Sequence, residues 1–211
     1  MEHTKKRLEM LGLYTFILSS MLGLISVALL PAIPALSDAA SWERLQSSNV
    51  YQIANYLLIY AYIVAIPGFW AVFNRYAQNR KQDVMGFWGM TLAIFGSAIP
   101  LISIGINTFV YPVLMQLGAD QAALIGESIF KGSTTVFLLF SGLFYLTGIV
   151  LLSVLILKQR KPLCTVAGIA LILHGVLIIM PAQVMVNLTS WLLLLCAGIL
   201  LIINAERSAM N

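Results

Sequence analysis

Apolar residues fill six long runs of this chain, and polar residues gather in the short segments between them. The runs cover residues 11–30, 50–73, 84–106, 133–157, 163–180 and 188–204, and none contains Asp, Glu, Lys or Arg. A helix of about 20 apolar residues crosses a hydrocarbon core about 30 Å thick. The pattern therefore predicts an all-α fold, a polytopic bundle of six transmembrane helices. Residues 1–211 form a single integral membrane domain in this interpretation.

Several helix ends are marked by proline. Pro31 and Pro34 follow the first run, and Pro181 follows the fifth. The third run stays apolar as far as Met115, but Pro100 gives its helix a reason to kink, which limits the predicted span to residues 84–106. Two connecting segments, 38–46 and 119–131, mix apolar and charged residues. They form either short helices at the membrane interface or extensions of the neighbouring helices.

Composition excludes a soluble protein. The chain is 60% apolar and only 9% charged, with a mean hydropathy of +0.93. Soluble domains carry about 25% charged residues, which they need for a hydrated surface. The net charge of +4 is explained by an excess of cations on one face of the membrane. It does not indicate a nucleic-acid partner, because anionic lipid headgroups account for a basic face.

The charges alternate from one connecting segment to the next. Of the 12 Lys and Arg residues, Arg44 and Lys131 lie in alternate connections and the others lie in the two tails and the remaining loops. These others are Lys5, Lys6, Arg7, Arg75, Arg80, Lys81, Lys158, Arg160, Lys161 and Arg207. Cytoplasmic segments of membrane proteins carry an excess of Lys and Arg. The distribution predicts six spans with both termini in the cytoplasm.

A few polar side chains fall at mid-membrane depth and are candidates for a ligand pocket. They are Tyr60, Tyr62, Asn107, Tyr145 and His174. A polar group in hydrocarbon needs a partner, so these residues point toward helix interfaces or cavities. They either line one pocket that opens to the outside or make separate hydrogen bonds between helices.

His174 is the only candidate among them whose free side chain titrates near neutral pH. It lies on a helical face with Ala167 and Ala170, beside Gly168 and Gly175. One interpretation makes it a proton-accepting or ligand-binding imidazole inside the bundle. The other makes it a neutral histidine that is hydrogen-bonded to a hydroxyl or carbonyl group of a closely packed neighbour.

Small residues at four-residue spacing predict where helices approach closely. Gly89, Ala93 and Ser97 form such a stripe in the third run, and Ser19 and Gly23 form a shorter one in the first. Small side chains let helix backbones come into contact in membranes. We expect these stripes to pack inside the bundle, with a homodimer face as the alternative.

No motif for catalysis or cofactor binding is present. The chain lacks an HExxH sequence, a GxSxG sequence and a glycine-rich phosphate loop. Its two cysteines, Cys164 and Cys196, cannot form a zinc cluster and lie at different predicted depths, which disfavours a disulfide. No cofactor or metal is therefore predicted, and a membrane enzyme remains a third hypothesis that no motif supports.

Two sequence segments support a resemblance. A basic loop after the second run reads FNRYAQNRKQD, and the fifth run opens with LKQRKPLCTVAGIALILHG. With the basic N-terminus, this layout resembles small bacterial six-helix integral membrane proteins of unknown function. The similarity is one of arrangement over most of the chain. It implies a multi-pass protein of the bacterial inner membrane and gives no activity.

Two functions lead at this point. The first is a transporter-like or small-molecule-binding component for a weakly charged or apolar ligand, built on the mid-depth polar residues. The second is an accessory or scaffold subunit, whose helices pack against a membrane-protein partner or a second copy of the chain. The lipid bilayer is the one partner that both have in common.

Overall fold

The computed structural model describes residues 2–30, 48–77, 83–110, 133–180 and 184–210, with isolated positions between 113 and 128. No strand occurs in these ranges. The elements are α1 (Glu2–Leu29), α3 (Asn49–Tyr76), α4 (Val84–Gly105), the π-helical turn η1 (Ile106–Val110), α7 (Ser133–Leu157), α8 (Pro162–Ile178) and α9 (Val184–Met210). Residues 38–46 lie outside the described residues, as do most of 119–131 and both Arg80 and Lys81.

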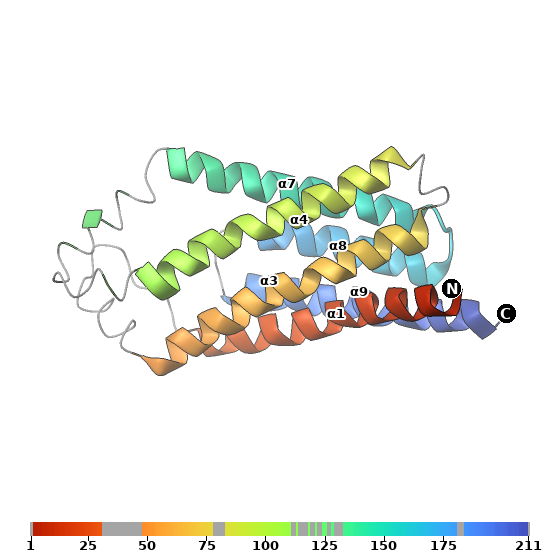
Figure 1. Ribbon diagram of the computed structural model, residues 1–211, viewed down its shortest axis with the longest axis horizontal. Coiled ribbons are helices and arrows are strands. Elements are labelled where there is room, and N and C mark those ends of the chain that lie inside the picture. The colour runs from red at the N-terminus through yellow and green to blue at the C-terminus, as the bar shows by residue number, and fades with distance from the viewer. Residues whose placement is uncertain are drawn as a thin grey trace.

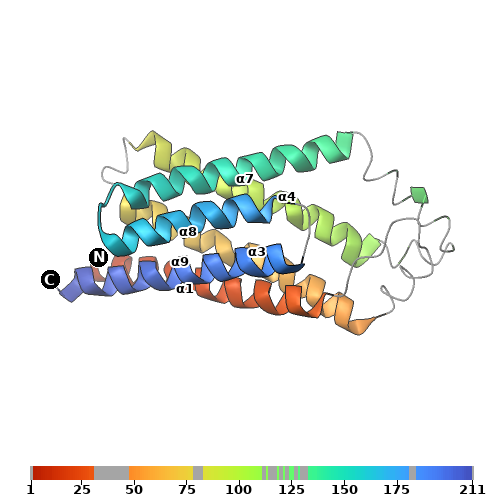
Figure 2. The ribbon, with the colours of Figure 1, turned by 180° about the vertical axis from the view of Figure 1, so that it is seen from behind.

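The six helices form a closed ring. Each helix packs against two neighbours, in the order α1, α3, α4, α7, α8, α9 and back to α1, and α3 also reaches α7 across the interior. Figures 1 and 2 show the helices running along one long axis, with the two chain termini together at one end. We call this end the basic end and the opposite one the far end.

Five helices are long and apolar enough to cross a membrane, as multi-pass membrane proteins require. Within the described residues these stretches are Thr4–Leu29, Asn49–Tyr76, Val84–Val110, Leu138–Leu157 and Val184–Ser208. The remaining helix, α8, is apolar but has only 17 residues. The all-helical fold is thus confirmed, together with five of the six predicted membrane-length elements.

The helices extend past the apolar runs at several ends. α7 has the predicted bounds, but α1 begins at Glu2 and α9 continues to Met210. Hydropathy detects only the apolar part of a helix, whereas the backbone hydrogen bonds continue through the charged turns that follow. In the third run the α-helix passes through Pro100 to Gly105 and then widens into η1.

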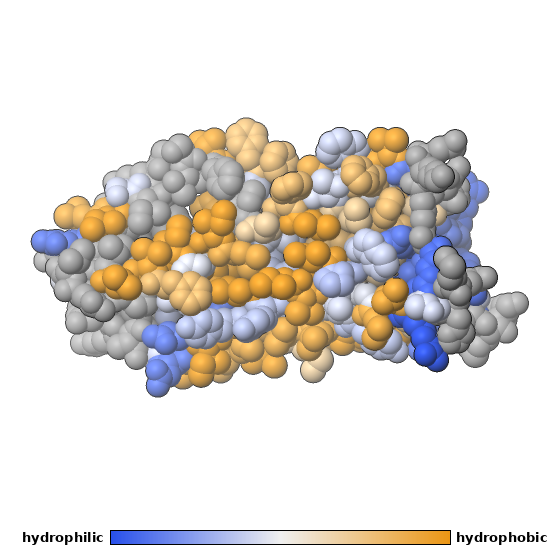
Figure 3. Space-filling view, viewed as in Figure 1, coloured by the Kyte–Doolittle hydropathy of each residue, from blue (hydrophilic) through white to orange (hydrophobic). Residues whose placement is uncertain are grey.

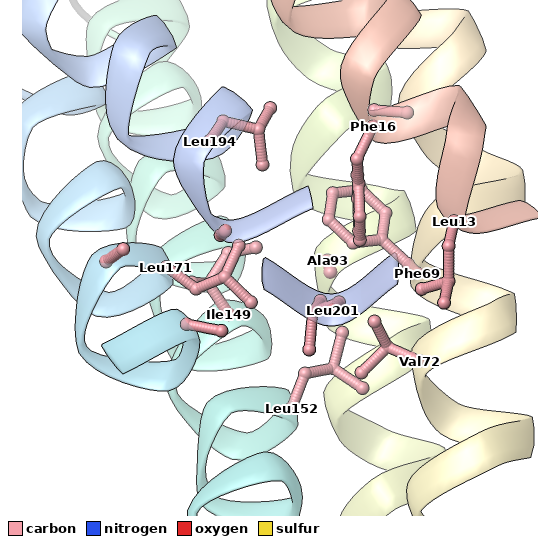
Figure 4. Close-up of a cluster of buried hydrophobic side chains, with 14 of the residues drawn as sticks. Leu13, Phe16, Phe69, Val72, Ala93, Ile149, Leu152, Leu171, Leu194 and Leu201 are labelled. Carbon is pink, nitrogen blue, oxygen red and sulfur yellow. The ribbon is translucent and has the colours of Figure 1, made fainter. Parts of the chain in front are cut away.

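Side chains from all six helices meet in the core. Figure 4 shows Phe16 of α1 and Phe69 of α3 beside Ala93, Leu152 and residues from α8 and α9. The rings of Phe16 and Phe69 make an edge-to-face contact with centroids 5.3 Å apart. The core is therefore one continuous cluster and not a set of separate helix pairs.

Serine hydrogen bonds connect α1 to α3, and a glycine lets the two helices pack closely. Ser19 Oγ donates to the carbonyl oxygen of Ala61 at 2.7 Å, and Ser26 Oγ donates to that of Ala54 at 2.8 Å. Opposite Phe16 stands Gly68, where a Cβ atom would lie 2.6 Å from the phenyl ring. The side-chain hydroxyls thus find backbone partners, as polar groups between membrane helices must.

Glycine brings α4 and α7 into backbone contact. A Cβ atom on Gly148 would overlap the backbone nitrogen of Ala93, and one on Gly89 would lie 2.9 Å from Leu151 Cβ. Ser97 is fully buried, and its hydroxyl donates to the carbonyl oxygen of Ala93 in its own helix. The structure therefore places the Gly89, Ala93 and Ser97 stripe inside the ring, with its two smallest members against α7.

Charged and polar groups gather at the basic end, as Figure 3 shows in the space-filling view. There Arg75 of α3 donates to the carbonyl oxygen of Ala205 in α9 at 3.1 Å, and its guanidinium lies 3.9 Å from the carboxylate of Glu9 in α1. Asn204 of α9 donates to the hydroxyl of Tyr76 at 3.3 Å. These contacts tie three helices together where the apolar core ends.

Candidate functional site

A cavity of about 730 Å³ lies in the half of the ring nearer the far end. We call it the pocket. All six helices, or the residues directly after them, contribute to its wall, and the described lining contains no Asp, Glu, Lys, Arg or His. Its aromatic lining residues are Tyr62, Tyr145 and Trp191, and its polar aliphatic ones are Ser103, Ser141 and Asn187. A volume of this size is typical of small-molecule sites, which span about 300–1,000 Å³.

The oblique course of α4 explains where the pocket forms. Figures 1 and 2 show α4 beside α7 at the basic end and nearer α3 at the far end. Gly89 and Gly96 hold α4 against α7 as far as the backbone of Tyr145. Beyond this crossing the two helices diverge, and Pro100, Ser103 and Leu138 line the pocket between them. Small residues hold the two helices together at the crossing, and the pocket lies between them on the side toward the far end.

A hydrogen-bonded network lies behind the pocket wall and joins three helices. The hydroxyl of Tyr145 in α7 is 2.8 Å from Nε2 of His174 in α8. Nδ1 of the same ring is 2.9 Å from the carbonyl oxygen of Ser190 in α9 and 2.8 Å from its hydroxyl oxygen. His174 is fully buried. Every polar atom of the imidazole therefore has a partner, as burial demands.

The partners fix the direction of these bonds for a neutral imidazole. A carbonyl oxygen can only accept, so Nδ1 carries the hydrogen and donates to Ser190. Nε2 is then the acceptor, and the Tyr145 hydroxyl donates to it. The hydroxyl of Ser190 donates in turn to the carbonyl oxygen of His174, at 3.2 Å. The phenol oxygen of Tyr145 is left with its acceptor lone pairs for any further partner.

Aromatic rings form a continuous row through the same region. The order is Phe69, Tyr145, His174, Trp191 and Tyr62, with neighbouring centroids 5.7 to 6.1 Å apart. Most neighbours meet edge to face, the arrangement that the ring quadrupoles favour. The row lies between the pocket and the packed core, and its three inner rings, Tyr145, His174 and Trp191, each contact a ring on both sides.

The structure brings together three of the five candidate pocket residues. Tyr62 and Tyr145 line the pocket, and His174 lies directly behind Tyr145 without reaching the lining. Tyr60 is 58% exposed on the outside of the ring. Two helical positions differ by about 200° in direction, so Tyr60 and Tyr62 cannot face the same side. Asn107 belongs to η1, and its side chain lies outside the described residues.

Trp191 is the main pocket residue that sequence reasoning missed. Trp191 is not among the five candidates from the sequence, yet its side chain is only 2% exposed and lines the pocket. Its indole stacks against Gly23 of α1, where a Cβ atom would overlap the ring. An inward tryptophan needs such a gap opposite it. The Ser19 and Gly23 stripe was the available signal, but nothing in the sequence pairs Gly23 with Trp191.

The lining of the pocket offers a ligand apolar contacts and a few hydrogen-bonding groups. Among the described residues, no three His, Cys, Asp or Glu side chains lie close enough together to hold a metal ion. Both cysteines are free thiols, with Cys164 buried and Cys196 exposed. Comparison of the chain with protein-family models, with curated proteins and with solved structures finds no match.

Proposed function

We propose that this chain is a six-span protein of the bacterial inner membrane that binds a small, uncharged and largely apolar molecule in the pocket, as a transporter-like or binding component. The observation that carries the proposal is the lining itself. A cavity of about 730 Å³ inside the ring has three aromatic walls, three small polar groups and no charge among its described residues. Such a site gives a charged ligand no counterion to replace its hydration.

The sixth span rests on the position of α8. Its 17 residues make a helix about 26 Å long, at the short end of transmembrane lengths. α8 packs between α7 and α9, both of which are long and apolar enough to cross. A helix inside this ring shares the layer that its neighbours occupy, which supports six spans.

The orientation rests on charge. The described cations Lys5, Lys6, Arg7, Arg75, Lys158, Arg160, Lys161 and Arg207 all belong to segments at the basic end. Cytoplasmic faces carry this excess, so we assign the basic end and both termini to the cytoplasm. The pocket then lies in the outer half of the membrane. Phe69, Leu152 and Leu171 fill the core toward the cytoplasmic side.

A pair of neighbouring substitutions tests binding. Ser103 lines the pocket, whereas Ile102 is exposed on the outside of the same helix. Purified protein in lipid nanodiscs is titrated with a panel of small uncharged molecules, using the fluorescence of Trp191. Ser103→Phe places a phenyl ring in the pocket and should weaken any binding by about tenfold or more. Ile102→Phe introduces the same ring on the lipid side and should leave binding unchanged.

Equal affinities for the two variants would place the bound molecule elsewhere and refute the pocket as its site. The scaffold alternative makes a different forecast for the same preparation. If no compound binds and a second membrane protein co-purifies in fixed ratio from mild detergent, an accessory role replaces the proposed one.

A further inference from the structure

Four apolar residues belong both to the pocket and to the outer surface of the ring. They are Leu139 and Leu143 of α7, and Ile179 and Met180 directly after α8. Their side chains are 65%, 53%, 40% and 48% exposed, in that order. A residue that lines a cavity and is also exposed on the outside marks an opening. We call the region between these residues of α7 and α8 the seam.

The seam lies where α8 is short and where α7 carries a glycine. α8 ends at Ile178, whereas α7 extends to Ser133 at the far end. Near this end Gly142 of α7 faces Ile179, where a Cβ atom would lie 3.2 Å from Cγ2, so α7 presents backbone and no side chain there. Deeper in the ring, Gly175 of α8 stands against both Ile149 and Leu146 of α7.

The position of the seam determines what reaches it. With the spans in a bilayer, the outer surface of α7 and α8 at this level faces lipid, since Leu139, Leu143 and the neighbouring Phe140 and Phe144 are all exposed there. A path from lipid to pocket through the seam therefore meets only apolar side chains. A hydrocarbon chain crosses it without losing hydration, whereas a polar solute would have to leave water first.

We propose that the ligand is a lipid-soluble molecule from the outer leaflet, whose hydrocarbon chain enters the pocket sideways through the seam and lies beside Trp191. This inference rests on the proposed function and specifies its ligand class. Asn187 and Ser103 bring an amide and a hydroxyl to the same cavity and would face an uncharged polar headgroup.

Tryptophan quenching by brominated lipid tests the seam directly. Trp42, Trp70 and Trp88 are replaced by Phe, so that Trp191 is the only emitter, and the protein is reconstituted with phospholipid brominated midway along one acyl chain. Bromine quenches an indole only at short range, and Trp191 is buried and lines the pocket. We expect strong quenching, comparable to that of a reference protein retaining only the exposed Trp88. An unquenched Trp191 would overturn the proposal.

Two glycine variants add a matched control. Gly142→Leu adds a side chain at the seam, against Ile179, and should reduce the quenching of Trp191, whereas Gly105→Leu places the same side chain where nothing lies within 4 Å and should not. Equal quenching in both would refute entry through the seam. If Gly142→Leu does not fold, the quenching of Trp191 in the protein that retains Gly142 still tests the proposal.

The result is separable from the test of binding. Where Ser103→Phe abolishes binding of a small molecule but brominated lipid does not quench Trp191, the pocket stands as a site reached from water. In that case only the proposal of lateral entry is overturned.

Discussion

The phenol oxygen of Tyr145 lies 2.8 Å from Nε2 of His174, so a residue of the pocket wall is anchored to a fully buried imidazole. Because His174 is itself held by Ser190, the bond orients the aromatic base of the pocket across three helices. The position of Tyr145 is therefore set by the bundle and not by a ligand.

Removal of the Tyr145 hydroxyl should destabilise the bundle measurably. Tyr145→Phe leaves Nε2 of His174 without its donor. Hydrogen bonds between membrane helices contribute about 0.6 kcal/mol on average, and a buried orphaned acceptor adds to this, so we expect a loss of about 1 kcal/mol. Denaturant titration in micelles measures it. Tyr60→Phe, the same change on the exposed face of α3, should cost less than about 0.5 kcal/mol. Equal losses would contradict the network.

The two contacts of His174 with Ser190 predict an order of effects. In Ser190→Ala the backbone carbonyl still accepts from Nδ1, so the loss should stay below about 1 kcal/mol. His174→Ala removes the bonds to both neighbours and leaves a cavity at the centre, which should cost about 2–4 kcal/mol. Unfolding free energies in the same micelles check the order. A Ser190→Ala loss as large as that of His174→Ala would mean that the hydroxyl, and not the carbonyl, holds the ring.

Hydropathy and helical direction account for how far the sequence predicted this structure. The apolar runs gave the helices because each run must satisfy its backbone internally in a bilayer. The apolar runs predicted the ends of the helices less accurately, because charged turns such as Lys5 to Arg7 are also helical. Tyr62 and Tyr145 were found from depth alone, but depth says nothing of direction. Tyr60 therefore shared the prediction although it faces outward.

The sequence could not predict contacts between helices that are distant along the chain. Trp191 lies inside because Gly23, in the first helix, leaves space for its indole. Arg75 pairs with Glu9 and with the carbonyl of Ala205 because the ring places α1 beside both α3 and α9. No local pattern encodes either pairing. The order of helices around the ring is needed first, and the hydropathy of single helices does not supply it.

The crossing of α4 and α7 should tolerate no added atom. Gly148→Ala would drive a methyl group into the backbone of Ala93 and force the helices apart. Overpacking of this kind costs about 1–3 kcal/mol, and here the obstacle is backbone, so we expect the upper part of that range or failure to fold. Gly105→Ala, with nothing within 4 Å of the new Cβ, is the matched control. Thermal stability in detergent compares them, and similar melting temperatures would contradict the close approach.

The guanidinium of Arg75 should stabilise the basic end more than an exposed cation does. Arg75→Gln removes the hydrogen bond to Ala205 and the pairing with Glu9. Hydrogen bonds to charged groups contribute about 1.5–3 kcal/mol, and the length of the ion pair argues for the lower part. Lys158→Gln makes the same charge change at an exposed position and should have little effect. Denaturant unfolding separates the two, and equal effects would reduce the Arg75 contacts to surface electrostatics.

The six-span topology forecasts that both ends of the chain are protected from the outside. In a background with Cys164 and Cys196 replaced by Ser, single cysteines are placed at Thr4, Gly118 and Glu206, and intact cells are treated with a membrane-impermeant maleimide. We expect labelling at Gly118 only, with Thr4 and Glu206 labelled after permeabilisation, because the cation-rich end stays inside. If α8, with its 17 residues, did not cross, the termini would lie on opposite sides. Labelling of Glu206 but not Thr4 in intact cells would therefore replace the six-span topology with five spans.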